Sequence, residues 1–318
     1  MNPIVDLKAT IALVQLTCHP SLRLGESFLS WEPFLDNEGT GPLETLWDND
    51  FHVDDLQKYC RDRYLLWHRA RLAAIVDWFQ DLEDLERPDV IVFPEGSIPR
   101  KFLSCLHSKL SRHGHSPTIF AGTHSFEWSK EAWQDYLALG VAEEQLKTLL
   151  ASEIESLSVC PILHHDGKRV TLQPKQLLSP WEVTAIGLSQ SSTTFTPTEV
   201  VHELSNKTKF TINAFVCSEA LQQLGTNPQT PDLLVVLSHN RDFSRFAALE
   251  EHYSKNQIPV AYCNDGRFGG SHVHVVNDAR NENWFARSPR SGSLPSGDGI
   301  LLLQTNLRVH PALSWVEI

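Results

Sequence analysis

Residues 209–219 read Lys-Phe-Thr-Ile-Asn-Ala-Phe-Val-Cys-Ser-Glu, and this stretch decides the fold. Its apolar run predicts a buried strand that ends at Cys217, and residues 220–224 behind it are compatible with a helix. The carboxyl end of a strand in an α/β sheet is where such folds usually place chemistry. Two other predicted strand ends carry polar residues that suit a reactive thiol, Glu95 and Lys175. We therefore expect these three residues to form one catalytic site.

The composition is that of an ordinary globular chain. It has 318 residues, of which 41% are hydrophobic and 21% charged. Length alone allows two domains, but single α/β domains of this size are common, so we expect one domain over residues 1–318. The formal net charge of −12 lacks the basic footprint that phosphate contacts require, so no nucleic-acid partner is expected.

The six cysteines are scattered along the chain, without a Cys-x-x-Cys pair or zinc spacing. The opening residues 1–8 lack the apolar region of a signal peptide. We therefore expect a reducing, cytoplasmic location rather than a disulfide framework. No apolar run approaches the roughly 18 residues that a membrane span requires, so no membrane contact is expected.

Apolar runs and turn signals divide the chain into alternating strands and helices, which favours α/β layers with right-handed crossovers. The strongest hairpin signal is Asp166-Gly167. Residues 18–54 are irregular and predict a lid or an insertion. Helices are expected at 54–86, with Ala70, Ala74 and Trp78 on its apolar face, and at 100–113, 126–158 with a break at Gly140, and 243–256. Strands are expected at 10–16, 89–95, 117–123, 159–165, 169–173, 193–204, 209–217, 232–238, 259–264, 269–276 and 299–305.

The three polar strand-end residues have complementary chemistry. A cysteine attacks as its thiolate, so a neighbour must take its proton, and Glu95 is the candidate general base. Lys175 would place positive charge where a tetrahedral oxyanion develops. Glu182 would position a substrate amine or relay a proton. Taken singly, Glu95 and Glu182 also fit solvated carboxylates, Lys175 a surface amine, and Cys217 a small buried hydrophobe.

Several short motifs resemble, in order and spacing, those of the nitrilase superfamily of carbon–nitrogen hydrolases, over most of the chain. In that family a Pro-Glu after the second strand carries the general base, a glycine hairpin leads to the catalytic lysine, and a turn after a later strand carries the cysteine. The matching residues here are Phe93-Pro-Glu95, Gly167-Lys168 with Pro174-Lys175-Gln-Leu-Leu178, Glu182, Val216-Cys217-Ser-Glu219, Asn264 and Gly269-Gly-Ser271.

The resemblance implies a four-layer α-β-β-α sandwich, with insertions near residues 18–54 and 126–158, and paired copies of the chain. It implies attack of Cys217 on a small-molecule amide or nitrile, a thioester intermediate, and no metal or cofactor. The backbone N–H of Ser218 would help Lys175 to bind the oxyanion. Trp181, Glu219 and Asn264 would join Ser218 in binding the substrate. The chain departs from the family at Ser218, where an aromatic residue is usual, and at Gln173-Pro174, where many members have Tyr-Arg.

Histidine pairs do not predict a metal site, because no third ligand at metal spacing accompanies His272 and His274 or the earlier pairs. Trp128 and Trp133 fit packing residues, whereas Trp181 also fits a pocket wall beside Glu182. The main alternative function is a nitrilase-like interaction or sensing module, which the two insertions and the finish at 314–318 would suit. A dinucleotide-binding enzyme is disfavoured, because no Gly-x-Gly-x-x-Gly follows a strand.

Overall fold

The structure is a computed structural model, and its elements follow the predicted alternation of strands and helices. It describes residues 8–17, 68, 70–83, 87–111, 116–122, 125–127, 130–150, 156–175, 177–178, 198–217, 219–222, 231–255, 258–266, 268–274, 298–306 and 309–317.

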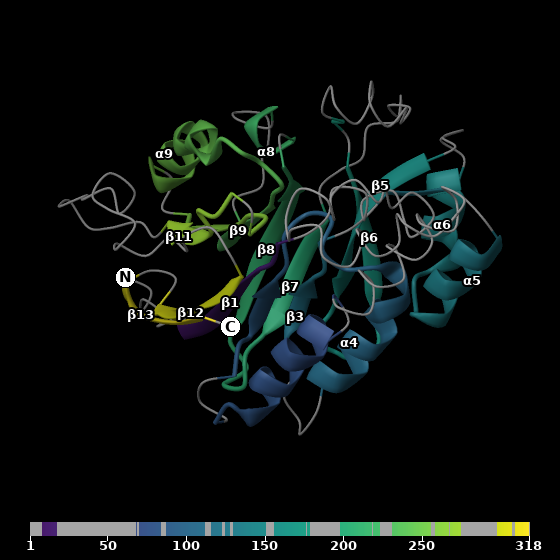
Figure 1. The fold of residues 1–318 in the computed structure, drawn as a ribbon, viewed down its shortest axis with the longest axis horizontal. Coiled ribbons are helices and arrows are strands. Elements are labelled where there is room, and N and C mark those ends of the chain that lie inside the picture. Colours follow the sequence, from purple (N-terminus) through teal and green to yellow (C-terminus); the bar gives the residue numbers. More distant parts are fainter. Residues whose placement is uncertain are drawn as a thin grey trace, which may run out of the picture.

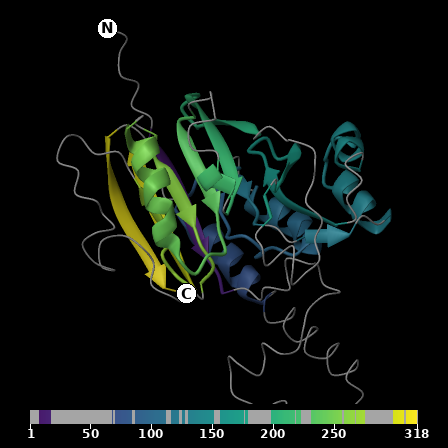
Figure 2. The same cartoon turned by 90° about the horizontal axis from the view of Figure 1, so that it is seen from above.

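A first sheet is built around three parallel strands, β1 (Lys8–Gln15), β2 (Val90–Val92) and β3 (Thr118–Phe120). Its order within the described residues is β13-β12-β1-β2-β3-β5-β4, and β6 pairs with β5. The hairpin of β12 and β13 lies beside β1 (Figure 2). The other strands are β4 (Ser125–Glu127), β5 (Ser156–Leu163), β6 (Val170–Pro174), β12 (Gly299–Asn306) and β13 (Val309–Glu317).

A second sheet has the order β11-β10-β9-β8-β7. Its centre is again parallel, with β8 (Lys209–Val216), β9 (Leu233–Leu237) and β10 (Val260–Cys263) side by side. Every residue of β9 and β10 is buried, as expected for strands that are covered on both faces. The outer strands β7 (Glu199–Glu203) and β11 (His272–His274) are antiparallel to their neighbours.

Three apolar clusters separate four layers. In β1, Ala12 packs into the cluster beneath the helices of the first sheet, while Leu13 packs into the cluster between the sheets. A third cluster joins Val236 of β9 to Leu249 of α9. The structure therefore has the predicted α-β-β-α arrangement, with α9 and α4 on opposite sides of the strands (Figure 1). The helices are α4 (Leu103–Leu110) after η3 (Arg100–Phe102), α5 (Lys130–Ala138), α6 (Glu143–Leu150), α8 (Glu219–Gln222), and α9 (Ala247–Lys255) after η4 (Phe243–Phe246).

Three local predictions were wrong. Helix with a break at Gly140 was expected over 126–158, but both ends of this range are strands. Strand β4 pairs with the start of β5, and this tertiary pairing overrides helix propensity. The β content was expected to finish at residue 305, whereas β13 follows it. This edge strand contains Pro311, a residue that edge strands tolerate. In the helix at 70–81, Ala70 and Ala74 are exposed, and the buried face is Leu72, Ile75, Val76 and Phe79.

Among the described residues, no helix is long and apolar enough to cross a membrane. Residues 18–54, for which a lid or insertion was predicted, lie outside the described part of the chain.

Candidate active site

The end of β2 and the end of β6 meet in a buried ion pair. Glu95 follows β2 through Phe93 and Pro94, and Lys175 follows β6 directly. Lys175 Nζ donates to Glu95 Oε1 over 2.8 Å, and their side chains are 0% and 1% exposed, respectively. Residues 80 apart in sequence are thus placed together by the first sheet and the β5–β6 hairpin, as the sequence predicted.

A tight turn fixes Glu95. Gly96 adopts φ 78°, a left-handed conformation that glycine allows without steric cost. Ser97 makes two hydrogen bonds to the Pro94 carbonyl oxygen. Its backbone N–H donates at 3.3 Å and its hydroxyl donates at 2.7 Å. Gly122 lies against the same carbonyl so closely that a Cβ there would stand 1.5 Å from the oxygen. The turn therefore has little freedom to move Glu95.

His68 supports this turn from the helical layer. Its Nε2 lies 2.5 Å from the Ser97 carbonyl oxygen, which can only accept a hydrogen bond. Burial, with a smaller contribution from the Arg71 charge, lowers the pKa of His68 to about 4. The imidazole is therefore neutral near pH 7, with its proton on Nε2.

Helix α6 fixes the β5–β6 hairpin, which leads to Lys175. Gln145 binds both backbone groups of Leu172: its amide nitrogen donates to the carbonyl at 3.0 Å, and its amide oxygen accepts from the N–H at 3.2 Å. At the hairpin tip Gly167 has φ 67°, and Asp166 accepts from two following backbone N–H groups. The predicted Asp166-Gly167 hairpin is therefore confirmed, and its last strand ends at Pro174, directly before Lys175.

Cys217 occupies a strained turn between β8 and α8. Its φ of 54° lies in the left-handed region that costs most non-glycine residues about 1–2 kcal/mol. The turn is held by Cys217 N–H donating to the Leu237 carbonyl at 2.7 Å, and by Glu219 accepting from Val216 N–H at 3.2 Å. Strain that the surrounding contacts maintain is common at functional sites. One oxygen of Glu219, predicted to bind substrate, thus braces this turn.

The Cys160 thiol of β5 lies in the apolar cluster between the two sheets. The pKa of Cys160 is raised chiefly by burial and then by the negative charges of Glu219 and Glu95. Both carboxylates therefore lie within electrostatic range of the same sulfur. The sheets are also joined by the Cys263 thiol, which lies 3.3 Å from the Val92 carbonyl at the end of β2.

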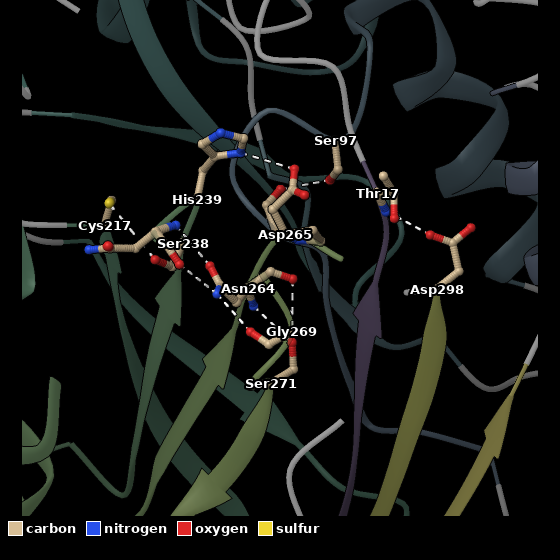
Figure 3. Close-up of polar contacts among 12 residues, drawn as sticks. Thr17, Ser97, Cys217, Ser238, His239, Asn264, Asp265, Gly269, Ser271 and Asp298 are labelled. Atoms are coloured by element: carbon tan, nitrogen blue, oxygen red, sulfur yellow. Dashed lines mark hydrogen bonds and ion pairs between the residues drawn. The ribbon is translucent and has the colours of Figure 1, made fainter. Parts of the chain in front are cut away.

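Asn264 stands at the end of β10, where its side chain clamps two loops (Figure 3). Its Nδ2 donates to the carbonyls of Asn240 and Gly269, at 2.9 and 2.7 Å, and its Oδ1 accepts from Asn240 N–H at 2.9 Å. These contacts to the backbone give Asn264 a positioning role, and its expected contact with the substrate stays a prediction.

The sequence interpretation missed two polar groups beside these turns. Ser238, at the end of β9, donates to Cys217 Sγ at 3.8 Å. His239 lies 3.0 Å from the buried carboxylate of Asp265 through its Nδ1 (Figure 3). Both residues lie at a strand end, the signal that had singled out Cys217. Among the described residues, no group of three or more His, Cys, Asp or Glu side chains has the arrangement of a metal site.

Three predicted site residues, Trp181, Glu182 and Ser218, lie outside the described part of the chain. Their proposed roles stay predictions.

No family model and no curated protein sequence matches the chain. Among solved structures it is similar to a carbon–nitrogen hydrolase from Helicobacter pylori G27, at 8% identity and a TM-score of 0.41, with 98% of this chain and 89% of that chain covered. It is similar to an N-terminal amidase with a Gln-Val peptide, at 10% identity and a TM-score of 0.39. It is also similar to the C. elegans NitFhit protein, at 10% identity and a TM-score of 0.37. These three proteins are nitrilase superfamily members. The chain covers 56% of the amidase chain and 62% of the NitFhit chain.

Proposed function

We propose that the protein is a cysteine-dependent hydrolase of non-peptide carbon–nitrogen bonds, acting on small amides in preference to nitriles. The observation that carries the proposal is the buried ion pair of Lys175 and Glu95. Removing two charges from water costs several kcal/mol per ion, and apolar residues of similar size often serve stability as well or better. A pair so deeply buried at two strand ends is therefore better explained by chemistry than by stability.

Cys217 would supply the nucleophile. Glu95 would accept the thiol proton, and the sulfur would attack the amide carbon to form a tetrahedral oxyanion. The Lys175 ammonium and the backbone N–H of Ser218 would stabilise that oxyanion. Glu95 would then return the proton to the nitrogen as the carbon–nitrogen bond breaks, which leaves a thioester and frees ammonia or an amine.

Water would complete the cycle. Glu95, again a carboxylate, would take a proton from water as the water attacks the thioester carbon. Collapse of the second tetrahedral intermediate would break the carbon–sulfur bond and release the acid. Glu95 would return its proton to the leaving sulfur, which restores the Cys217 thiol and the Glu95 carboxylate. Glu182 would assist by holding the amine, and Trp181 and Glu219 would line the substrate's path.

Two further proposals accompany this reading. The resemblance to nitrilases implies paired copies, which light scattering of the purified protein measures directly. It also implies that no cofactor takes part, so activity is expected to survive exhaustive dialysis against a chelator.

The test is ammonia release from a panel of small carboxamides and nitriles, compared between wild type, Cys217→Ala and Glu95→Gln. We expect turnover of at least one carboxamide by wild type and none by either variant. Equal release by Cys217→Ala and wild type would exclude the thiol mechanism. No release from any panel member would favour the interaction module.

A further inference from the structure

Two hydroxyl groups connect the Cys217 thiol to the interior of the second sheet. Ser238 Oγ donates to Cys217 Sγ at 3.8 Å, and Tyr262 Oη donates to Ser238 Oγ at 3.0 Å. Ser238 and Tyr262 are both 0% exposed, and Cys217 is 6% exposed. Cys217, Ser238 and Tyr262 come from three successive parallel strands of the second sheet, and Figure 3 shows Ser238 pointing toward the sulfur.

The donor and acceptor roles in these two contacts suit the chemistry of the two hydroxyls, with Tyr262 donating to Ser238 and Ser238 to Cys217. A serine hydroxyl has one hydrogen and two lone pairs, so a hydrogen received from Tyr262 leaves its own hydrogen available for the sulfur. Tyr262 keeps its hydrogen, because burial raises the pKa of this phenol well above 10, and a charge on Cys217 raises it further. The Tyr262 hydrogen therefore points to Ser238 and the Ser238 hydrogen points to the Cys217 sulfur. A hydrogen bond to the sulfur favours the thiolate over the thiol.

Packing holds the relay in place. Ser238 is fixed by its backbone, because its N–H donates to the Cys263 carbonyl at 2.8 Å and its carbonyl accepts from Asp265 N–H at 3.2 Å. The Tyr262 ring stacks on His272, with centroids 5.2 Å apart. His272 is in turn held by Glu250 at 2.6 Å. Donors fixed before the reaction stabilise a developing charge without reorganisation.

We propose that Ser238 and Tyr262 form a hydroxyl relay that stabilises the Cys217 thiolate. Ser238 donates to the sulfur itself, and Tyr262 is a positioning residue that acts through Ser238. The inference rests on the proposed function, because it takes Cys217 as the reactive thiol. It differs from the Glu95 and Lys175 roles, since it approaches the sulfur from the second sheet. The titratable groups around the relay are Glu250, His272, Cys263, His239 and Asp265 from the second sheet and its helix, and Glu219 on the thiol's own turn.

The experiment measures the iodoacetamide labelling rate of Cys217 from pH 5 to 9, by mass spectrometry of the Cys217 peptide. It compares wild type with Ser238→Ala, Ser238→Thr, Tyr262→Phe and the double variant Ser238→Ala/Tyr262→Phe. The reference protein and every variant also carry Cys105→Ser, because Cys105 is an exposed thiol that would react as well. A hydrogen bond to a charged group stabilises that group enough that its loss raises the pH midpoint of labelling by about one unit. Below the midpoint, labelling then becomes about tenfold slower.

We expect this shift for Ser238→Ala, recovery toward wild type for Ser238→Thr, and a smaller shift for Tyr262→Phe. The double variant is expected to match Ser238→Ala, because Tyr262 acts only through Ser238. If Ser238→Ala lowers thermal stability but leaves the midpoint in place, the relay is overturned and the proposed function stands. Additive shifts in the double variant would also overturn the relay. A wild-type Cys217 that is labelled no faster than an ordinary thiol at any pH would overturn both.

Discussion

Lys175 Nζ donates to Glu95 Oε1 at 2.8 Å where water does not reach either side chain. Removing one partner leaves the other charge buried alone, which typically costs about 3–5 kcal/mol. Lys175→Met is therefore expected to lower the free energy of unfolding by that amount in urea titrations. The double variant Glu95→Gln/Lys175→Met removes both charges and is expected to be more stable than Lys175→Met. A cost below about 1 kcal/mol for the single variant would contradict the buried pair.

Gly122→Ala tests the turn that holds Glu95. The new Cβ would stand 1.5 Å from the Pro94 carbonyl oxygen, so the Pro94–Ser97 turn must move. We expect a loss of several kcal/mol in the free energy of unfolding and no measurable turnover.

Gly167→Ala is the matched control, because its Cβ would meet only the Ser116 hydroxyl at 3.9 Å. It still suffers from φ 67°, at a cost of about 1–2 kcal/mol. Equal effects of the two alanine substitutions on unfolding and turnover would show that the close approach of Gly122 to Pro94 is unimportant.

The stability of the protein is expected to depend on His68 at mildly acidic pH. The pKa of His68 falls from 6.5 in the unfolded chain to about 4 in the fold. Between these pH values the unfolded chain binds more protons than the folded chain. The stability that the fold gains from a neutral His68 is therefore fully present above pH 6.5 and is lost as the pH falls toward 4. The difference corresponds to about 3 kcal/mol.

The measurement is the free energy of unfolding of wild type and His68→Gln from pH 7.5 to 4. The glutamine amide can still donate to the Ser97 carbonyl, so the variant isolates the titration of the imidazole. We expect the wild-type curve to fall more steeply below pH 6.5. Parallel curves would contradict the lowered pKa of His68.

Asn264→Ala separates a structural clamp from a substrate contact. The variant loses three hydrogen bonds to the backbone, so we expect a loss of about 2–4 kcal/mol in the free energy of unfolding. A substrate contact would instead raise KM with little change in stability, and that result would confirm the original expectation. Urea unfolding and steady-state kinetics on the same preparation distinguish the two.

Periodicity and turn signals were enough to predict most strands, because buried parallel strands are continuous apolar runs bounded by turns. They failed where tertiary pairing decides the structure. The segment at 125–127 becomes strand only because it pairs with residues 156–158. The apolar face of the helix at 70–81 was predicted only in part. Trp78 packs against the core, but Ala70 and Ala74 are exposed, and packing instead buries Leu72, Ile75, Val76 and Phe79.

The candidate site was only partly predictable. Strand-end position selected Glu95, Lys175 and Cys217, and the structure pairs the first two. The contact of Ser238 with Cys217 depends on which strand lies beside β8, and this order cannot be read from local sequence. Tyr262 lies inside β10, where a sequence pattern gives no reason to separate it from packing residues.

The most direct test of the nucleophile is the labelling of Cys217 by iodoacetamide near neutral pH, followed by intact mass in wild type, Cys217→Ala and Glu95→Gln. Cys160 and Cys263 are expected to stay unlabelled, because burial raises the pKa of each thiol. We predict one fast site in wild type, which is lost in Cys217→Ala and slowed in Glu95→Gln. If the fast site persists in Cys217→Ala, or if Cys217 reacts no faster than the exposed Cys105, Cys217 is not an activated nucleophile.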